Sequence, residues 1–71
     1  MKTYLVTFGV GTVFKGKCLI LTSDNEEKVR EYAYDHYGRL NISSFYDYEE
    51  KKDIIKTYNY EILEIKSLWF M

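Results

Sequence analysis

In two stretches near the start of the chain, side chains at alternate positions fall into two sets that would lie on opposite faces of a strand. This period of two residues is that of a β-strand. Residues 3–10 carry tyrosine, valine and phenylalanine at alternate positions, and residues 17–22 carry isoleucine and leucine on both sides. Such β-branched and aromatic residues favour strands. The segment between the stretches is short and contains three glycines in or beside it. We therefore expect the two strands to form an antiparallel hairpin.

The stretch from Ser23 to Gly38 changes to helical spacing. One face collects side chains at i, i+3, i+4, i+7 and i+8, namely Val29, Tyr32, Ala33, His36 and Tyr37. Ser23 and Glu26 have the spacing of a capping box, in which side chains satisfy free N–H groups of the first turn. Gly38 suits the left-handed conformation that often follows the last turn. The pattern predicts an amphipathic helix over this stretch.

The second half of the chain is less regular. Residues 42–48 contain strand-forming side chains, and residues 60–66 predict a last strand. Ile62, Leu63 and Ile65 cannot all lie on one face of a regular strand. Their pattern indicates a bulge, or burial on both faces.

Between these strands, a short helix is expected over residues 48–57. Asp47 and Glu50 repeat the capping-box spacing at its start, and Asn59 provides a break after its end. Three apolar side chains would form its inner side, namely Ile54, Ile55 and Tyr58.

The predicted order is β-β-α-β-(short α)-β, which places the chain in the α+β class. A small, mainly antiparallel sheet packed against one amphipathic helix buries both apolar surfaces economically. At 71 residues the chain makes one domain, residues 1–71, near the size at which a single core is just sufficient. The apolar tail from Leu68 to Met71 is expected to fold onto the core or to lie in a subunit interface.

Composition narrows the possible functions. A net charge of −1 argues against a broad phosphate-binding surface. Cys18 is the single cysteine, so it has no partner for an internal disulfide, and no signal peptide is recognised. No apolar run approaches the length of a membrane span. We expect a cytoplasmic protein with no membrane association.

A nucleotide-binding loop is the strongest motif that the sequence suggests. Gly11 to Cys18 fits the P-loop pattern, with cysteine in place of the final hydroxyl residue. A P-loop opens a helix whose N-terminus holds the phosphates, but the strand-like residues 19–22 follow here. The segment is therefore interpreted as the turn of the hairpin.

Catalysis and metal binding find little support. His36 is the single histidine, and with Cys18 it supplies two good metal ligands where zinc needs three or four. A thiol–imidazole pair would also lack an orienting group and an oxyanion site. We expect no catalytic residue, no metal site and no cofactor.

Eight tyrosines allow two interpretations. In one, Tyr4, Tyr32, Tyr37 and Tyr58 belong to the core or its rim. In the other, an exposed set forms a binding surface, because tyrosine covers much area at low entropic cost. The members of that set are Tyr34, Tyr46, Tyr48 and Tyr60.

An exposed tyrosine surface could stack the bases of a nucleic-acid single strand. Stacking needs cationic side chains beside it, and Arg39, Lys51 and Lys52 are the candidates. Lys15 and Lys17 could add to them.

The chain resembles small proteins of bacteriophages and prophages of Gram-positive bacteria, most of which have no assigned function. The resemblance covers most of the chain and rests on these segments: Tyr4-Leu5-Val6-Thr7-Phe8-Gly9-x-Gly11, Lys15-Gly16, residues 19–22, Glu26-Glu27, Tyr37-Gly38 and Lys56-Thr57-Tyr58-Asn59. It implies a product of a mobile element that acts in the host cytoplasm. Small proteins of that kind often bind and inhibit host machinery or host defences.

The leading hypothesis is a non-enzymatic protein–protein interaction module whose partner is a host protein. The candidate contacts are Tyr34, Tyr46, Tyr48, Trp69 and Phe70. A single-stranded nucleic-acid-binding protein is the alternative, and its affinity would fall steeply with salt. A homodimer formed through the apolar tail is a third possibility, since small chains gain stability by oligomerising.

Overall fold

The structure is a computed structural model and describes residues 1–68. Its elements follow the predicted order, and the α+β class is confirmed. The strands are β1 (Lys2–Phe8), β2 (Lys17–Ser23), β3 (Ile42–Asp47) and β4 (Glu61–Ser67). The helices are α1 (Glu26–Tyr37), α2 (Tyr48–Lys51) and α3 (Asp53–Thr57), with a 3₁₀ turn at Arg39–Asn41.

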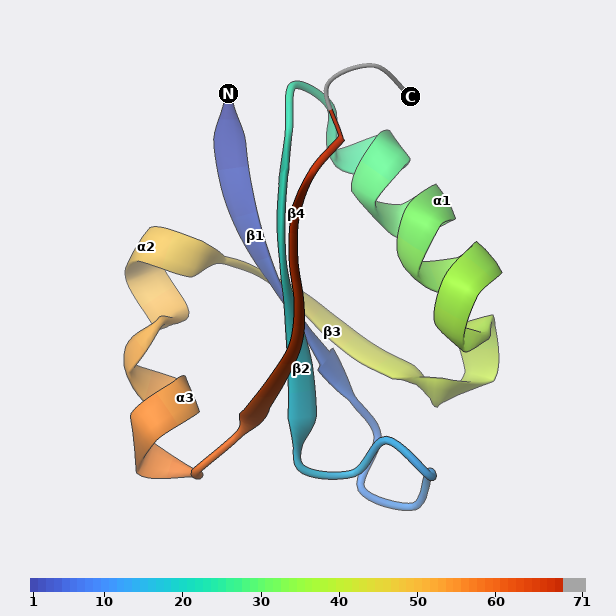
Figure 1. The fold of residues 1–71 in the computed structure, drawn as a ribbon, viewed down its shortest axis with the longest axis vertical. Helices are drawn as coiled ribbons and strands as arrows, with labels where there is room; N and C mark the ends of the chain where they lie inside the picture. The colour runs from blue at the N-terminus through green and yellow to red at the C-terminus, as the bar shows by residue number, and fades with distance from the viewer. Residues whose placement is uncertain (69–71) are drawn as a thin grey trace.

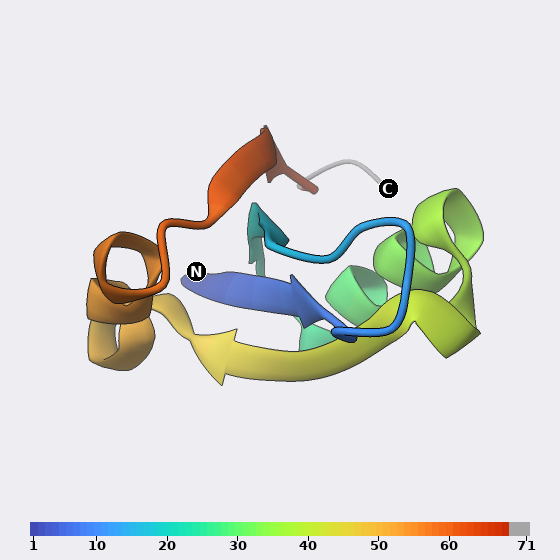
Figure 2. The same ribbon diagram turned by 90° about the horizontal axis from the view of Figure 1, so that it is seen from below.

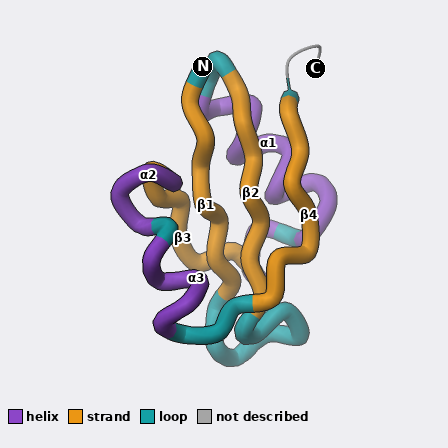
Figure 3. Tube along the Cα trace, turned by 60° about the vertical axis from the view of Figure 1, so that its left-hand side comes forward, coloured by secondary structure: helices purple, strands orange, loops and turns teal. Residues whose placement is uncertain are grey.

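The four strands form one sheet in the order β3-β1-β2-β4. β1 pairs antiparallel with both β2 and β3, which confirms the predicted hairpin. β4 joins the other side of β2 in the parallel direction, because the chain first passes through β3, α2 and α3 before it returns (Figure 3). The sheet is therefore mainly antiparallel, with one parallel pair at its edge.

Both faces of the sheet are covered. α1 lies on one side, and α2 and α3 lie on the other (Figures 1 and 2). The α1 side holds the larger cluster of buried side chains: Tyr4, Val6, Phe8, Leu19, Leu21, Val29, Tyr32, Ala33 and Leu68. The opposite side holds Leu5, Cys18 and Ile20, against which partly buried residues of α2, α3 and their neighbours pack. The prediction of one covering helix was thus incomplete, since the short helices form a second layer.

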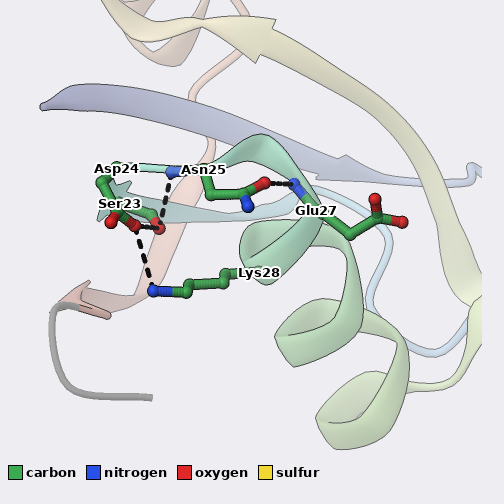
Figure 4. A network of polar contacts seen from close by, with 5 residues as sticks. All are labelled: Ser23, Asp24, Asn25, Glu27 and Lys28. Atoms are coloured by element: carbon green, nitrogen blue, oxygen red, sulfur yellow. Dashed lines mark hydrogen bonds and ion pairs between the residues drawn. The ribbon is translucent and has the colours of Figure 1, made fainter.

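The start of α1 differs from the predicted capping box. Asn25 is the N-cap, and its Oδ1 accepts a hydrogen bond of 2.7 Å from the Glu27 N–H (Figure 4). Ser23 is the last residue of β2, and its Oγ accepts from the Asn25 N–H at 3.2 Å. Glu26 forms an ion pair with Arg30, 2.7 Å between Oε2 and Nη2. The sheet extends to Ser23, so the helix begins two residues later than the capping box requires.

The helix ends where the sequence predicts. Gly38 follows α1 with φ 89° and ψ 126°, and its N–H donates to the Tyr34 carbonyl at 3.0 Å. A positive φ is a conformation that glycine adopts without the steric cost that a Cβ would bring.

Two side chains expected in the core lie outside it. His36 is exposed: its ring stacks on the Tyr32 ring with 3.9 Å between the ring centroids, and its Nδ1 lies 2.9 Å from the Tyr32 carbonyl oxygen. Tyr58 is 67% exposed, because α3 ends one residue earlier and the chain turns there. The break predicted at Asn59 is confirmed by its φ of 55°.

The irregularity predicted in the last strand is confirmed as a bulge. Cys18 pairs with Ile62, whereas the next residue of β2, Leu19, pairs with Glu64. Leu63 is the extra residue of β4. Beyond the bulge, Ile65 pairs with Ile20, so Ile62 and Ile65 both stand on the α2–α3 side of the sheet. Such a bulge changes which side chains share a face of the strand.

Candidate functional site

An open groove lies between α2–α3 and the start of β4. It has a volume of about 480 Å³. Eight residues line it: Tyr48, Lys52, Asp53, Ile55, Lys56, Asn59, Tyr60 and Ile62.

Local hydrogen bonds hold the helical wall of this groove in place. Asp47 caps α2 by accepting from the Glu49 N–H at 3.2 Å. After α3, the Tyr60 N–H donates to the Ile55 carbonyl at 2.9 Å, which folds the chain back toward the sheet. The chain then enters β4, whose first residue donates from its N–H to the Gly16 carbonyl at 2.9 Å. The groove therefore lies between two segments that are joined by a tight turn.

The floor of the groove is apolar and continuous with the core. Tyr48, Ile55 and Tyr60 are half-buried and pack against the Leu5, Cys18 and Ile20 cluster. Ile62 closes the far wall and stays 40% exposed. Apolar side chains that are anchored on one side and open on the other suit an incoming apolar group.

The rim of the groove carries charge of both signs. Lys52, Lys56 and Asp53 line it and all are exposed. The Lys52 ammonium lies 3.3 Å from a carboxylate oxygen of Glu49, a contact between solvent-exposed groups. An exposed ion pair of this kind contributes little and exchanges partners readily. The rim is therefore suited to a ligand that carries carboxylates beside an apolar group.

The candidate protein contacts that lie within residues 1–68 do not form one surface. Tyr48 lines the groove, and Tyr46 packs on the same side of the sheet against the Leu5 cluster. Tyr34 belongs to α1 on the other side, where its ring meets Phe45 edge-on at 5.8 Å. Trp69 and Phe70 lie outside the described residues. The tail is confirmed to reach the core as far as Leu68, which is fully buried.

The candidate nucleic-acid contacts are also separated. Lys51 and Lys52 lie at the end of α2, with the Lys51 ammonium 5.9 Å from the Tyr46 ring centre. Arg39 follows α1, which covers the opposite side of the sheet, and its guanidinium lies 5.3 Å from the Tyr34 ring centre. These cations therefore do not line one continuous groove.

Cys18 and His36 are kept apart by the sheet. Cys18 is fully buried on the α2–α3 side, and burial raises the pKa of its thiol. His36 is exposed on α1, on the other side. The structure brings no thiol–imidazole pair together.

The segment that fits the P-loop pattern forms the turn of the hairpin. The Thr12 hydroxyl donates to the Gly9 carbonyl at 2.8 Å, and Gly16 has a φ of 78°. β2 follows directly, so the helix that a P-loop requires is replaced by a strand.

Five lining residues of the groove were not among the sequence-based candidates: Asp53, Ile55, Lys56, Asn59 and Ile62. The sequence pattern predicted that Ile55 lies on the inner side of its helix, and Ile55 does pack against the core there. The pattern did not predict that Ile55 also lines an open groove. The mixed pattern around Ile62 was the available signal, because a side chain displaced by a bulge often stands at a sheet edge.

Comparison of the chain with protein-family models, with curated proteins and with solved structures gives no match in any of the three. Among residues 1–68, no cluster of three or more histidine, cysteine or acidic side chains could hold a metal ion. Within the same residues, no helix is both long and apolar enough to span a membrane.

Proposed function

We propose that this chain is a non-enzymatic protein–protein interaction module and that the groove between α2–α3 and β4 receives a segment of its partner. The observation that carries the proposal is the open apolar lining formed by Tyr48, Ile55, Tyr60 and Ile62. Tyrosine at the centre of a small interface provides a large contact area with little loss of side-chain entropy.

The rim defines the chemistry of the partner segment. Lys52 and Lys56 supply two ammonium groups, of which Lys52 already contacts Glu49, and Asp53 supplies one carboxylate. A segment with one large apolar side chain flanked by aspartate or glutamate would satisfy both the floor and the rim. The resemblance to bacteriophage and prophage proteins supports a host protein as the partner, met in the host cytoplasm, with inhibition of host machinery or defence as the outcome.

The test is a capture experiment that depends on the groove. Wild-type protein and the variants Lys56→Glu and Ile62→Lys are immobilised, and each is exposed to lysate of a Gram-positive host with and without nuclease. Lys15→Glu is the matched control for Lys56→Glu, because Lys15 is also exposed but lies in the β1–β2 turn. Circular dichroism verifies that every variant is folded.

A host protein that wild type and Lys15→Glu retain after nuclease, and that both groove variants lose, supports the proposal. Equal retention by the groove variants contradicts the assignment of the groove. Loss of all captured material on nuclease treatment contradicts the protein-binding function and favours the nucleic-acid alternative. In that case affinity for an oligonucleotide should fall steeply with salt.

A further inference from the structure

The outer edge of β4 is a second exposed surface, and it shares Ile62 with the groove. β4 is the last strand of the sheet, and within residues 1–68 it pairs with β2 alone. Ile65 is 73% exposed there, although it lies in the middle of a strand. An exposed edge strand with apolar side chains is a template for pairing with another strand.

We propose that β4 pairs antiparallel with β4 of a second copy of this chain, so that two sheets join into one. The two-fold axis lies between Leu63 and Glu64. In this register Ile62 faces Ile65 of the second copy, and Glu61 faces its Lys66. Each contact occurs twice, as an isologous interface requires.

The bulge makes this register possible. In a regular strand, residues 62 and 65 point to opposite faces, so they could not meet across an antiparallel pair. Here Ile62 pairs with Cys18 and Ile65 with Ile20, and the bulge between them places both on the α2–α3 face. Two isoleucines of each copy then form one apolar strip across the junction.

The other face supplies complementary charge. Glu61 lies beside Lys17, 2.8 Å between its Oε1 and the lysine Nζ, on the face that Leu19 shares with α1. Lys66 stands on the same face, with its ammonium 5.4 Å from the centre of the Tyr32 ring. In the proposed register each Lys66 gains a carboxylate opposite it, as cross-strand pairs favour.

Neighbouring registers are worse. A shift that centres the pair on Glu64 places two like carboxylates opposite each other and sets Ile62 against Lys66. A shift that centres it on Leu63 sets Ile62 against Glu64 and Ile65 against Glu61. Both shifts replace an apolar pair and an ion pair by mismatched contacts.

The proposal is tested by analytical ultracentrifugation of the full chain. The protein concentration is varied from roughly 10 µM to roughly 1 mM, the range over which a dimer with a small interface changes from mostly dissociated to mostly associated. The weight-average mass of wild type should rise from 8.6 kDa toward twice that value. Ile65→Lys should weaken the dimer at least about tenfold, because it places a charge opposite Ile62 in both halves of the junction. Val13→Lys is the matched control, since Val13 is 82% exposed in the β1–β2 turn, and it should dimerise as wild type does.

A charge exchange tests the register. Glu61→Lys places two lysines opposite each other and also removes the Lys17 ion pair. The double variant Glu61→Lys/Lys66→Glu loses the same ion pair but restores opposite charges across the junction. It should therefore dimerise about threefold more tightly than Glu61→Lys alone, since each exposed pair contributes little and the dimer contains two.

Three results would overturn the proposal: a wild type that stays at monomer mass over the whole range, a dimer that Ile65→Lys leaves unchanged, or a double variant no tighter than Glu61→Lys. The second would assign dimerisation to another surface. Thermal unfolding of Ile65→Lys at low concentration separates loss of pairing from loss of fold, because a monomer as stable as wild type shows that the fold persists.

Discussion

The Tyr32 hydroxyl on α1 donates a hydrogen bond of 2.5 Å to Glu64 Oε1 on the edge strand β4. The Tyr37 hydroxyl lies 3.4 Å from the other oxygen of the same carboxylate. One half-buried carboxylate thus joins two turns of the helix to the strand that follows the bulge. Since β4 is bonded to the sheet on one side only, this contact adds a second attachment for it.

Tyr32→Phe should lower the free energy of unfolding by about 1–2 kcal/mol, because it removes a hydrogen bond to a charged acceptor that is partly withdrawn from water. Urea denaturation followed by circular dichroism measures the change. Tyr58→Phe is the control, because Tyr58 is 67% exposed and its hydroxyl is free to bond water. Equal stability of Tyr32→Phe and wild type would show that the contact contributes nothing to the fold.

The same contact predicts how stability depends on alkaline pH. Burial and the Glu64 carboxylate raise the pKa of Tyr32, and the same causes raise the pKa of Tyr37. The unfolded chain therefore releases these protons near pH 10, whereas the folded chain still holds them. Stability from this source is complete below about pH 10 and is lost as pH rises further.

Denaturation at a series of pH values from 8 to 11 tests this dependence, with those values chosen to bracket the ordinary pKa of tyrosine, about 10. Wild type should lose stability more steeply than Tyr32→Phe above pH 10, so the difference between them should narrow. Any effect of pH that does not involve Tyr32 is common to both proteins and cancels in the difference. Parallel curves would contradict the proposed linkage.

The N-cap of α1 distinguishes the observed helix start from the capping box that the sequence suggests. Asn25→Ala should cost about 1 kcal/mol, because the Glu27 N–H loses its side-chain acceptor. Asn25→Ser keeps an acceptor and should restore most of the loss. Glu26→Gln should have a small effect, since Glu26 faces Arg30 on the surface rather than a backbone N–H. A larger loss for Glu26→Gln than for Asn25→Ala would favour the capping box.

The sequence predicts the order of elements well, because hydrophobic periodicity and the residues that end an element are both local properties of the chain. Only a few residues adjacent in sequence are needed to recognise each of these signals. They are the alternation across β1 and β2, the apolar face of α1, and the breaks at Gly38 and Asn59. The cap was misplaced by two residues because Ser23 and Asn25 are both good caps, and only the length of β2 decides between them.

The place of β4 could not be predicted in the same way. Its parallel pairing with β2 depends on where α2 and α3 direct the chain, which is a long-range property. The groove has the same origin, since Tyr48 and Ile62 are 14 positions apart and meet only after the turn at Asn59. Exposed tyrosines were expected from their number, but the fold uses Tyr46 and Tyr60 to cover a second small core.

The glycine after α1 gives the sharpest prediction about backbone conformation. Gly38 has a φ of 89°, and a Cβ there would lie 3.1 Å from Asn41 Nδ2. That nitrogen donates to the Tyr37 carbonyl at 2.7 Å, so it cannot move away without losing a hydrogen bond. Gly38→Ala should therefore cost at least about 1–2 kcal/mol, the usual cost of a positive φ for a residue with a Cβ.

Gly11→Ala is the matched control for this change. A Cβ at Gly11 would meet no atom within 4 Å, and its φ lies outside the positive range. The free energy of unfolding should stay within about 0.5 kcal/mol of wild type, as for other surface substitutions. Urea denaturation of both variants measures the pair. Equal stabilities would mean that the helix can end without a positive φ, and that the connection from α1 to β3 is set by Asn41 rather than by Gly38.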